Sequence, residues 1–135
     1  MLEWDAFPKV NVAFMDQDHH ACLDLIQRLL SAIDNEQSSN AVIDEELAAL
    51  GAHLTAHFSR EERAMEETGF PPYYVHKAEH DSVLQEFQQN VREWQGTEDR
   101  TALRRFIAIS FSNWLETHAL MMDMVTAQHL KKSRV

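Results

Sequence analysis

Cysteine is nearly absent from this sequence, because Cys22 is the only one among 135 residues. A single cysteine excludes an intramolecular disulfide and a cysteine-rich zinc motif, and it is typical of a reducing compartment. The first residues are acidic and lack the basic end and apolar run of a signal peptide. No stretch approaches the ~18 consecutive apolar residues of a membrane span. We therefore expect a cytoplasmic protein.

Basic residues are also scarce. Twelve lysines and arginines stand against 22 aspartates and glutamates, which gives a net charge of -10. A surface of this sign repels phosphate backbones and anionic lipid. Neither nucleic acid nor a membrane is an expected partner.

Apolar residues are abundant, and in four stretches they recur every three or four positions, the period of an amphipathic helix. Loop signals separate these stretches: the polar run 35–40, Gly69 followed by two prolines, and Gly96. The predicted helices span about residues 17–36, 41–67, 72–94 and 98–129. Four long helices with short connections predict an all-α fold, an up-down-up-down four-helix bundle.

Residues 1 to about 15 contain aromatic residues without a sustained helical period, which indicates an extended N-terminal arm packed on the bundle. With no internal repeat or low-complexity segment, residues 1–135 are expected to form a single domain. Asp16 is expected to cap the first helix and Thr97 the fourth. Gly69 and Gly96 are expected to end the second and third helices.

Several polar side chains share the inward-facing stripes with the apolar residues, or lie close behind them. They are Ser110, which is uncharged, and seven titratable residues: His19, His57, Glu61, His76, His80, His118 and Asp123. Any one of the histidines alone is best explained as an ordinary core residue. Seven titratable groups together cannot share an apolar core unless they are paired or bound to metal.

The types of these side chains indicate which metals would suit them. Imidazole together with carboxylate suits iron, zinc, copper or manganese, whereas calcium and magnesium prefer oxygen alone. One tetrahedral zinc needs only four ligands, so seven candidates favour two metals that share the carboxylates as bridges.

The same residues resemble those of the hemerythrin family, in particular its single-domain bacterial members, over essentially the whole chain. The matching motifs are Trp4-Asp5, Asp16 three before His19, Leu25-Ile26, His57-Phe58, Glu61-Glu62, Met65, Phe70-Pro71, His76, His80, Trp114-Leu115, His118 and Asp123. The resemblance implies a non-haem di-iron centre with an oxo or hydroxo bridge that binds dioxygen reversibly. Its implied ligands are His76, His80 and His118 on one iron, His19 and His57 on the other, and Glu61 and Asp123 as bridges.

The function implied by the resemblance is oxygen binding rather than catalysis, for oxygen storage, transport, or delivery to an oxygen-consuming enzyme. Two alternatives remain open: a sensor of oxygen, nitric oxide or redox state, and a weak di-iron peroxidase or a ferroxidase. The dioxygen pocket is expected to be lined by Phe58, Trp114, Leu115 and Ala119. Core packing alone would also explain the three larger residues. Ala119 stands where the family usually has a large aliphatic residue, and the smaller side chain is expected to open the pocket.

The resemblance implies that His118 and Asp123 are both ligands of one metal centre. Asp123 follows His118 by five residues, and in a regular helix this spacing does not bring two side chains together. Five residues turn about 140° beyond a full turn, so the two side chains would diverge. We therefore predict a π-bulge, a local widening of the helix, between about residues 117 and 124.

Three further residues stand close to the candidate site in sequence. Asp18 occurs where glutamine is common in the family, and Cys22 is expected to be a small buried apolar residue. Glu62 is expected either to be solvated or to bind a ligating histidine. Histidines outside the family pattern are expected on the surface or in helix packing; they are His20, His53 and His129.

Overall fold

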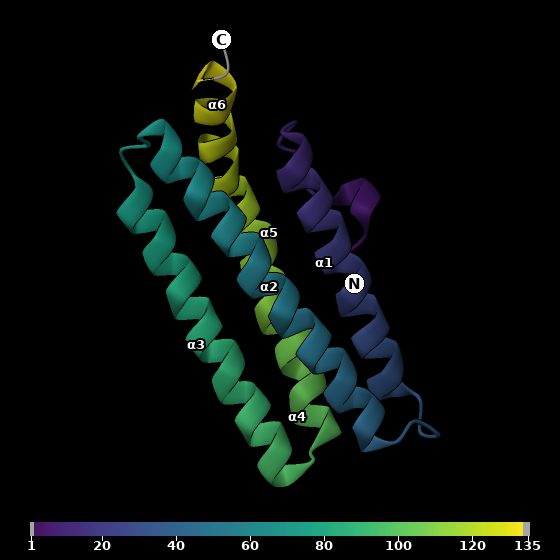
Figure 1. Cartoon of the computed structure of the whole chain (residues 1–135). Coiled ribbons are helices and arrows are strands. Elements are labelled where there is room, and N and C mark those ends of the chain that lie inside the picture. Colours follow the sequence, from purple (N-terminus) through teal and green to yellow (C-terminus); the bar gives the residue numbers. More distant parts are fainter. Residues whose placement is uncertain (1, 134–135) are drawn as a thin grey trace.

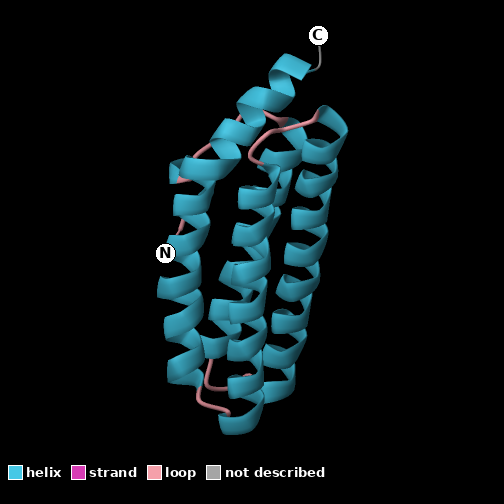
Figure 2. Cartoon of the chain, turned by 90° about the vertical axis from the view of Figure 1, so that its left-hand side faces the viewer, coloured by secondary structure: helices cyan, strands magenta, loops and turns pink. Residues whose placement is uncertain are grey.

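Four long helical segments run side by side in alternating directions in the computed structural model of the chain (Figure 1). The first and third connections lie at one end of the bundle, and the second lies at the other (Figure 2). The structure describes residues 2–133, so Met1, Arg134 and Val135 of the expected domain lie outside the described residues. Within that range the chain contains helices and no β-strand. The predicted all-α, up-down-up-down bundle is confirmed.

The first three segments are regular α-helices, and the fourth is a continuous helix in which α-helical and π-helical stretches alternate. Their bounds are α1 Ala13–Asp34, α2 Asn40–Thr68 and α3 Tyr73–Thr97. The fourth consists of α4 Arg100–Arg105, η2 Phe106–Phe111, α5 Ser112–His118, η3 Ala119–Asp123 and α6 Met124–Ser133. A short 3-10 turn, η1 Trp4–Ala6, lies in the N-terminal arm. No helix within residues 2–133 combines the length and apolarity that spanning a bilayer requires.

The arm is shorter than expected, because α1 begins at Ala13 rather than near residue 17. Asp16 therefore lies inside the first turn and does not cap the helix. Its carboxylate reaches back and accepts hydrogen bonds from the backbone N–H groups of Val10 at 2.9 Å and Asn11 at 3.0 Å. A negative charge is favourable in this first turn, close to the positive end of the helix dipole. Asp16 thus ties the arm to α1.

Gly69 ends α2 as predicted. It adopts φ 65°, in the left-handed region that favours glycine. Its N–H donates to the carbonyl oxygens of Met65 and Glu66, which satisfies part of the helix end.

The predictions for the end of α3 and the start of the fourth segment are wrong by a few residues. The helix α3 continues past Gly96 and ends at Thr97. The next residue, Glu98, takes the left-handed conformation with φ 52° and caps the helix. Asp99 rather than Thr97 caps α4, by accepting a hydrogen bond from the N–H of Ala102 at 3.1 Å. Thr97 belongs to the last turn of α3, where its hydroxyl donates to the carbonyl oxygen of Glu93 and accepts from the N–H of Asp99, which lies before the first turn of α4.

Buried apolar side chains form two clusters. The main apolar cluster takes residues from all four segments, including Leu29, Leu50 and Phe111. The small apolar cluster consists of Val10, Val12, Met15, Ala127 and Leu130. On α1, His19 falls between Met15 of the small cluster and Cys22 of the main one. The candidate metal ligands therefore form a polar layer between two apolar regions.

The fourth segment contains two π-helical stretches. The stretch η3, Ala119–Asp123, confirms the π-bulge predicted from the spacing of His118 and Asp123. The other, η2, was not predicted, and it explains why Ser110 is exposed although the regular period places it inward. A π turn holds one residue more than an α turn, so Ser112 is buried instead and donates to the carbonyl oxygen of Ile107 at 2.8 Å.

Candidate metal centre

All seven titratable residues predicted for the site come together in the polar layer. They are His19 from α1, His57 and Glu61 from α2, His76 and His80 from α3, His118 from α5 and Asp123 from η3. None of these side chains is more than 2% exposed. Four separate segments are therefore needed to build the site.

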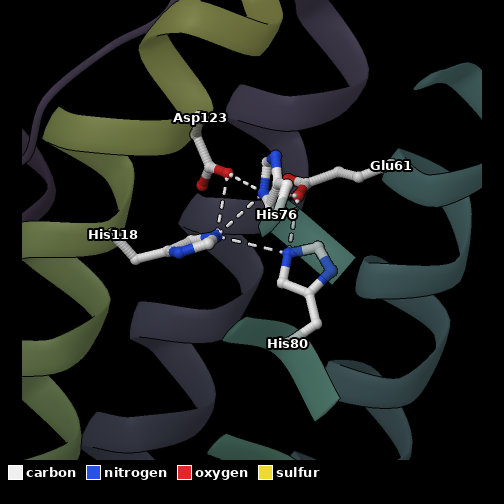
Figure 3. A group of neighbouring side chains, drawn as sticks. All are labelled: Glu61, His76, His80, His118 and Asp123. Atoms are coloured by element: carbon white, nitrogen blue, oxygen red, sulfur yellow. Dashed lines mark hydrogen bonds and ion pairs between the residues drawn. The ribbon is translucent and has the colours of Figure 1, made fainter. Parts of the chain in front are cut away.

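Three imidazoles and two carboxylates form one part of the site, which we call the three-histidine group (Figure 3). Nε2 of His118 lies 3.0 Å from Nε2 of His76 and 3.2 Å from Nε2 of His80. Oδ1 of Asp123 lies 3.0 Å from Nε2 of His76 and 3.1 Å from Nε2 of His118. Oε1 of Glu61 lies 3.2 Å from Nε2 of His80. The ligand atoms of all five residues lie within 4.8 Å of one another.

His19, His57 and the same Glu61 form the other part, the two-histidine group. Oε2 of Glu61 lies 2.8 Å from Nε2 of His57 and 3.9 Å from Nε2 of His19. Oδ2 of Asp123 lies 2.8 Å from Nε2 of His19. Each carboxylate thus turns one oxygen to the three-histidine group and the other to the two-histidine group. This is the arrangement that two carboxylates need to bridge a pair of metal ions.

The π stretch η3 brings Asp123 into the site. With 3.6 residues per turn, a side chain five positions after His118 would point away from the bundle axis. The wider turn at Ala119–Asp123 restores the alignment, and Asp123 is 1% exposed. The site therefore depends on a local departure from regular helix geometry.

Each imidazole of the three-histidine group has a hydrogen-bond partner at its outer nitrogen. Nδ1 of His80 lies 2.9 Å from Oε2 of Glu62, so the second of the two alternatives for Glu62 holds. Nδ1 of His118 lies 2.9 Å from Oε1 of Glu79, and Nδ1 of His76 lies 2.8 Å from Oγ1 of Thr126. Such partners fix the orientation of a ligating ring.

Glu79 and Thr126 were not identified from the sequence. Glu79 carries a usable signal, because it is an acid directly before His80 on a helix that also bears His76. A search for an anionic partner of each candidate imidazole would have included it. Thr126 has no distinctive signal, since a threonine near the end of a helix is ordinary.

The hydrogen-bond pattern favours a cation at the centre. A carboxylate only accepts hydrogen bonds, so Glu62 and Glu79 place the proton on Nδ1 of His80 and His118. In the neutral rings Nε2 then carries a lone pair directed into the shared space. Oε1 of Glu61 and Oδ1 of Asp123 are buried there without a hydrogen bond of good geometry, although ring nitrogens lie nearby. A metal ion bound by these atoms satisfies the lone pairs and both oxygens, so the residues present fit a metal.

Protonation holds the same groups together in the metal-free protein. Burial alone would raise the pKa of Glu61, but the imidazoles of His57, His76 and His80 outweigh it and hold the pKa well below its ordinary value. Burial alone would lower the pKa of His76, but Asp123 and Glu61 raise it to about 9. Metal binding must displace such protons, because only the unprotonated nitrogen is a ligand.

The residues predicted for a dioxygen pocket lie close against the ligands. The ring of Phe58 stacks on His80 at 4.0 Å between centroids, and the ring of Trp114 stacks on His118 at 4.5 Å. Leu115 and Ala119 are completely buried in the main apolar cluster. The rings of Phe58 and Trp114 cover two of the candidate ligands, and the role of all four residues in dioxygen binding stays a prediction.

The remaining histidines lie outside the centre, as expected. His20 is about half exposed, and Nε2 of His129 lies 3.0 Å from Oγ1 of Thr68. Nε2 of His53 lies 2.9 Å from the backbone carbonyl oxygen of Asp18. These contacts are surface or packing contacts.

A bundle of four antiparallel helices whose interior holds histidines and shared carboxylates defines a class of helical metal-binding proteins. The model of one family in this class, the "Hemerythrin HHE cation binding domain", matches residues 10–130. The chain belongs to the hemerythrin family.

Individual relatives agree with this assignment. The chain is 32% identical over 122 residues to the bacteriohemerythrin of Aquifex aeolicus (strain VF5), covering 90% of this chain and 92% of the relative. It is 28% identical over 123 residues to the bacteriohemerythrin of Ralstonia nicotianae, covering 91% and 84%. A crystal structure of wild-type hemerythrin superimposes with a TM-score of 0.81 at 24% identity and 96% coverage of both chains, which shows the same fold.

Proposed function

We propose that this protein binds dioxygen reversibly at a non-haem di-iron centre, for oxygen storage or for delivery to an oxygen-consuming enzyme. The observation that carries the proposal is the placement of Glu61 and Asp123. Each carboxylate turns one oxygen to the three-histidine group and the other oxygen to the two-histidine group. Membership of the family and its bacteriohemerythrin relatives support iron as the metal and dioxygen as the ligand.

Each residue has a distinct role in the proposal. His76, His80 and His118 would hold one iron, His19 and His57 would hold the other, and both would share Glu61 and Asp123. The two-histidine group offers fewer protein donors, so an iron held there would have room for an external ligand. When bound, the two ferrous ions supply the site for dioxygen and the electrons on which its reversible binding depends.

The surroundings of the site suit binding rather than oxidation. Five imidazoles with only two carboxylates make a less electron-rich ligand set than one dominated by carboxylates, so cleavage of the O–O bond is not favoured. Phe58 and Trp114 cover the rings of His80 and His118, and with Leu115 they keep water away from the reacting atoms.

The test is an optical spectrum of the anaerobically reduced, iron-loaded protein, recorded before air is added, after it is added and after it is removed. A visible charge-transfer band that appears with air and disappears on deoxygenation is expected, with two irons per chain. Irreversible conversion to an oxidised form would favour sensing or peroxidase chemistry instead. A protein that binds no iron would contradict the proposal as a whole.

A second candidate, weak peroxidase activity, is favoured by one observation: the completely buried residue 119 is an alanine. A small side chain leaves more room for peroxide near the ligands than a large aliphatic one. Replacement of Ala119 by leucine is then expected to slow both peroxide turnover and autoxidation. Unchanged rates of both processes would rule out a role for this position.

A further inference from the structure

The two histidine groups differ in what orients their rings. In the three-histidine group Nδ1 of every imidazole has a side-chain partner: Thr126, Glu62 or Glu79. In the two-histidine group Nδ1 of His19 and Nδ1 of His57 are both buried without a hydrogen-bond partner. The position of His19 and His57 must therefore be fixed by something other than hydrogen bonds to their outer nitrogens.

An ion pair directly beside the two-histidine group joins the helices that carry it. Nε of Arg60 donates to Oδ2 of Asp18 at 2.8 Å, and Nη2 of Arg60 donates to Oδ1 at 2.6 Å. Two parallel hydrogen bonds from a planar guanidinium to both carboxylate oxygens fix angle as well as distance. The Asp18 side chain is 12% exposed and the Arg60 side chain 44%, so the carboxylate is shielded from solvent while the guanidinium remains partly exposed.

A second contact from α2 reaches the backbone at the same point of α1. Nε2 of His53 donates to the carbonyl oxygen of Asp18 at 2.9 Å. His53 and Arg60 are seven residues apart, about two helical turns, and they flank His57 on α2. Asp18 is thus held at its side chain and at its backbone by two residues of one neighbouring helix.

The members of the ion pair are the chain neighbours of two candidate ligands. Asp18 directly precedes His19, and Arg60 directly precedes Glu61. Within a helix the backbone is rigid, so a fixed distance between Asp18 and Arg60 also fixes the separation of His19 from Glu61. The three-histidine group does not need such an ion pair, because each of its rings has its own hydrogen-bond partner.

We propose that Asp18 and Arg60 are positioning residues for the two-histidine group, and that they determine how tightly the second of two metal ions is held. The three-histidine group binds the first ion, and its affinity does not depend on this ion pair. The inference rests on the metal centre of the proposed function, but not on dioxygen binding.

Simple electrostatics would make a different prediction. If Asp18 acted only as a nearby negative charge, its loss would weaken cation binding, but the loss of the positive charge of Arg60 would strengthen it. Positioning predicts that either loss weakens the second ion. Arg60→Lys separates the two explanations further, because lysine keeps the charge and loses the two parallel hydrogen bonds.

The experiment is a titration of metal-free protein with Co²⁺ under anaerobic conditions, followed by calorimetry and by the visible absorption of bound Co²⁺. The variants are Asp18→Asn, Arg60→Lys, Arg60→Gln and the double variant Asp18→Asn/Arg60→Gln. The control is Asp34→Asn, which removes another aspartate–arginine contact of α1, to Nε of Arg104 at 2.7 Å, at the opposite end of the helix. Circular dichroism of each metal-free variant shows that it is folded.

The wild-type protein is expected to bind Co²⁺ in two steps of unequal affinity. Each single variant of the pair is expected to weaken the second step about tenfold, the scale on which outer partners of metal ligands act, and to leave the first step unchanged. The double variant is expected to weaken the second step no further than a single variant, since one interaction is lost in each case. Asp34→Asn is expected to change neither step.

Two binding steps of equal affinity in the wild type would overturn the inference. So would a second step that Arg60→Gln tightens or that Arg60→Lys leaves unchanged. Equal weakening of both steps by the variants of the ion pair would overturn it as well. If Asp18→Asn does not fold, Arg60→Lys alone decides, because it preserves the charge at the site. A wild-type protein that binds no Co²⁺ would instead contradict the metal centre itself, so the two failures are distinguishable.

Discussion

The main apolar cluster and the polar layer beside it show two ways of filling the interior of one bundle. In the cluster, side chains such as Leu29, Ile43 and Leu50 are completely buried and contribute by the area they remove from water. In the layer, buried groups such as Glu61 and His80 are stable only because each faces an opposite charge, a hydrogen-bond partner or a metal. The cluster thus supplies the stability of the fold, and the layer uses that stability to hold the candidate metal ligands together.

The largest expected effect comes from a cavity in the main cluster. Leu50→Ala removes a completely buried side chain and is expected to lower the free energy of unfolding of the metal-free protein by about 2–5 kcal/mol. The folded variant is expected to bind the same number of metal ions as the wild type. Urea unfolding and a metal count test both statements. Val42→Ala, at a 39% exposed position of the same helix, is the control and should change the stability much less than Leu50→Ala.

Metal loading is expected to have an effect of similar size through the polar layer. At a free metal concentration of about 1,000 times the dissociation constant, loading should raise the free energy of unfolding by about 4 kcal/mol. Glu61→Gln removes the carboxylate shared by both groups, so this increment should fall. Urea unfolding with and without metal measures it. An increment that is unchanged in Glu61→Gln would mean that the metal binds elsewhere.

Alkaline pH is expected to weaken the metal-free polar layer and not the cluster. The pKa of His76, raised to about 9 by Asp123 and Glu61 against the effect of burial, lies above the ordinary value of 6.5. This contribution to stability is complete below pH 6.5 and is lost as the pH rises through about 9. The urea midpoint of metal-free protein should therefore fall across this interval.

Two controls sharpen the pH experiment. His76→Gln should remove part of the alkaline decline, and Leu50→Ala should lower the urea midpoint without changing its pH dependence. An equally steep decline in His76→Gln would show that another group is responsible.

The outer partners of the three-histidine group should have a smaller effect, confined to metal affinity. Glu62→Gln and Glu79→Gln each replace an anionic acceptor of a ring N–H by a neutral amide, and each should weaken metal binding about 10–100-fold. Competition with a chelator of known affinity measures the change. Glu67→Gln, at an exposed position of α2, is the control for the loss of one negative charge.

The smallest effect is expected for Cys22, which belongs to the main cluster although it lies three residues from His19. Burial, with a smaller contribution from the charge of Asp18, raises the pKa of the thiol to about 12. The folded protein should therefore resist alkylation at neutral pH, and the urea-unfolded chain should react. Cys22→Ala should cost about 1 kcal/mol of stability and leave metal affinity unchanged. Rapid alkylation of the folded protein would show that this part of the cluster opens.

The helical period was sufficient to predict the bundle and six of the seven candidate ligands, because inward positions of a regular helix repeat reliably. Asp123 lies off that period, and its role follows from the resemblance; the π stretch η3 was then predicted because His118 and Asp123 can converge only if the helix widens. The second stretch η2 gave no such signal: its apolar residues fit a regular register nearly as well, and Ser110 was misplaced as a result. Thr126 could not be predicted, because the rotation of one helix against another is not contained in the period of either. Glu79 did carry a signal, as an acid directly before His80, but the helical period does not use it.

The start of α1 shows a further limit. Asp16 was interpreted as a cap because aspartate is favoured both at the cap position and in the first turn of a helix. Only the contacts with Val10 and Asn11 distinguish the two positions. Contacts between distant segments, such as Asp18 with Arg60, were likewise beyond what one sequence can specify.

The proposed function requires one polar layer that holds two irons, with Glu61 and Asp123 shared between them. Diffraction from crystals of the iron-loaded protein, recorded at the iron absorption edge, tests this arrangement. We expect two anomalous peaks per chain, one beside Nε2 of His76, His80 and His118 and the other beside Nε2 of His19 and His57. A single peak, or peaks away from these nitrogens, would contradict the account.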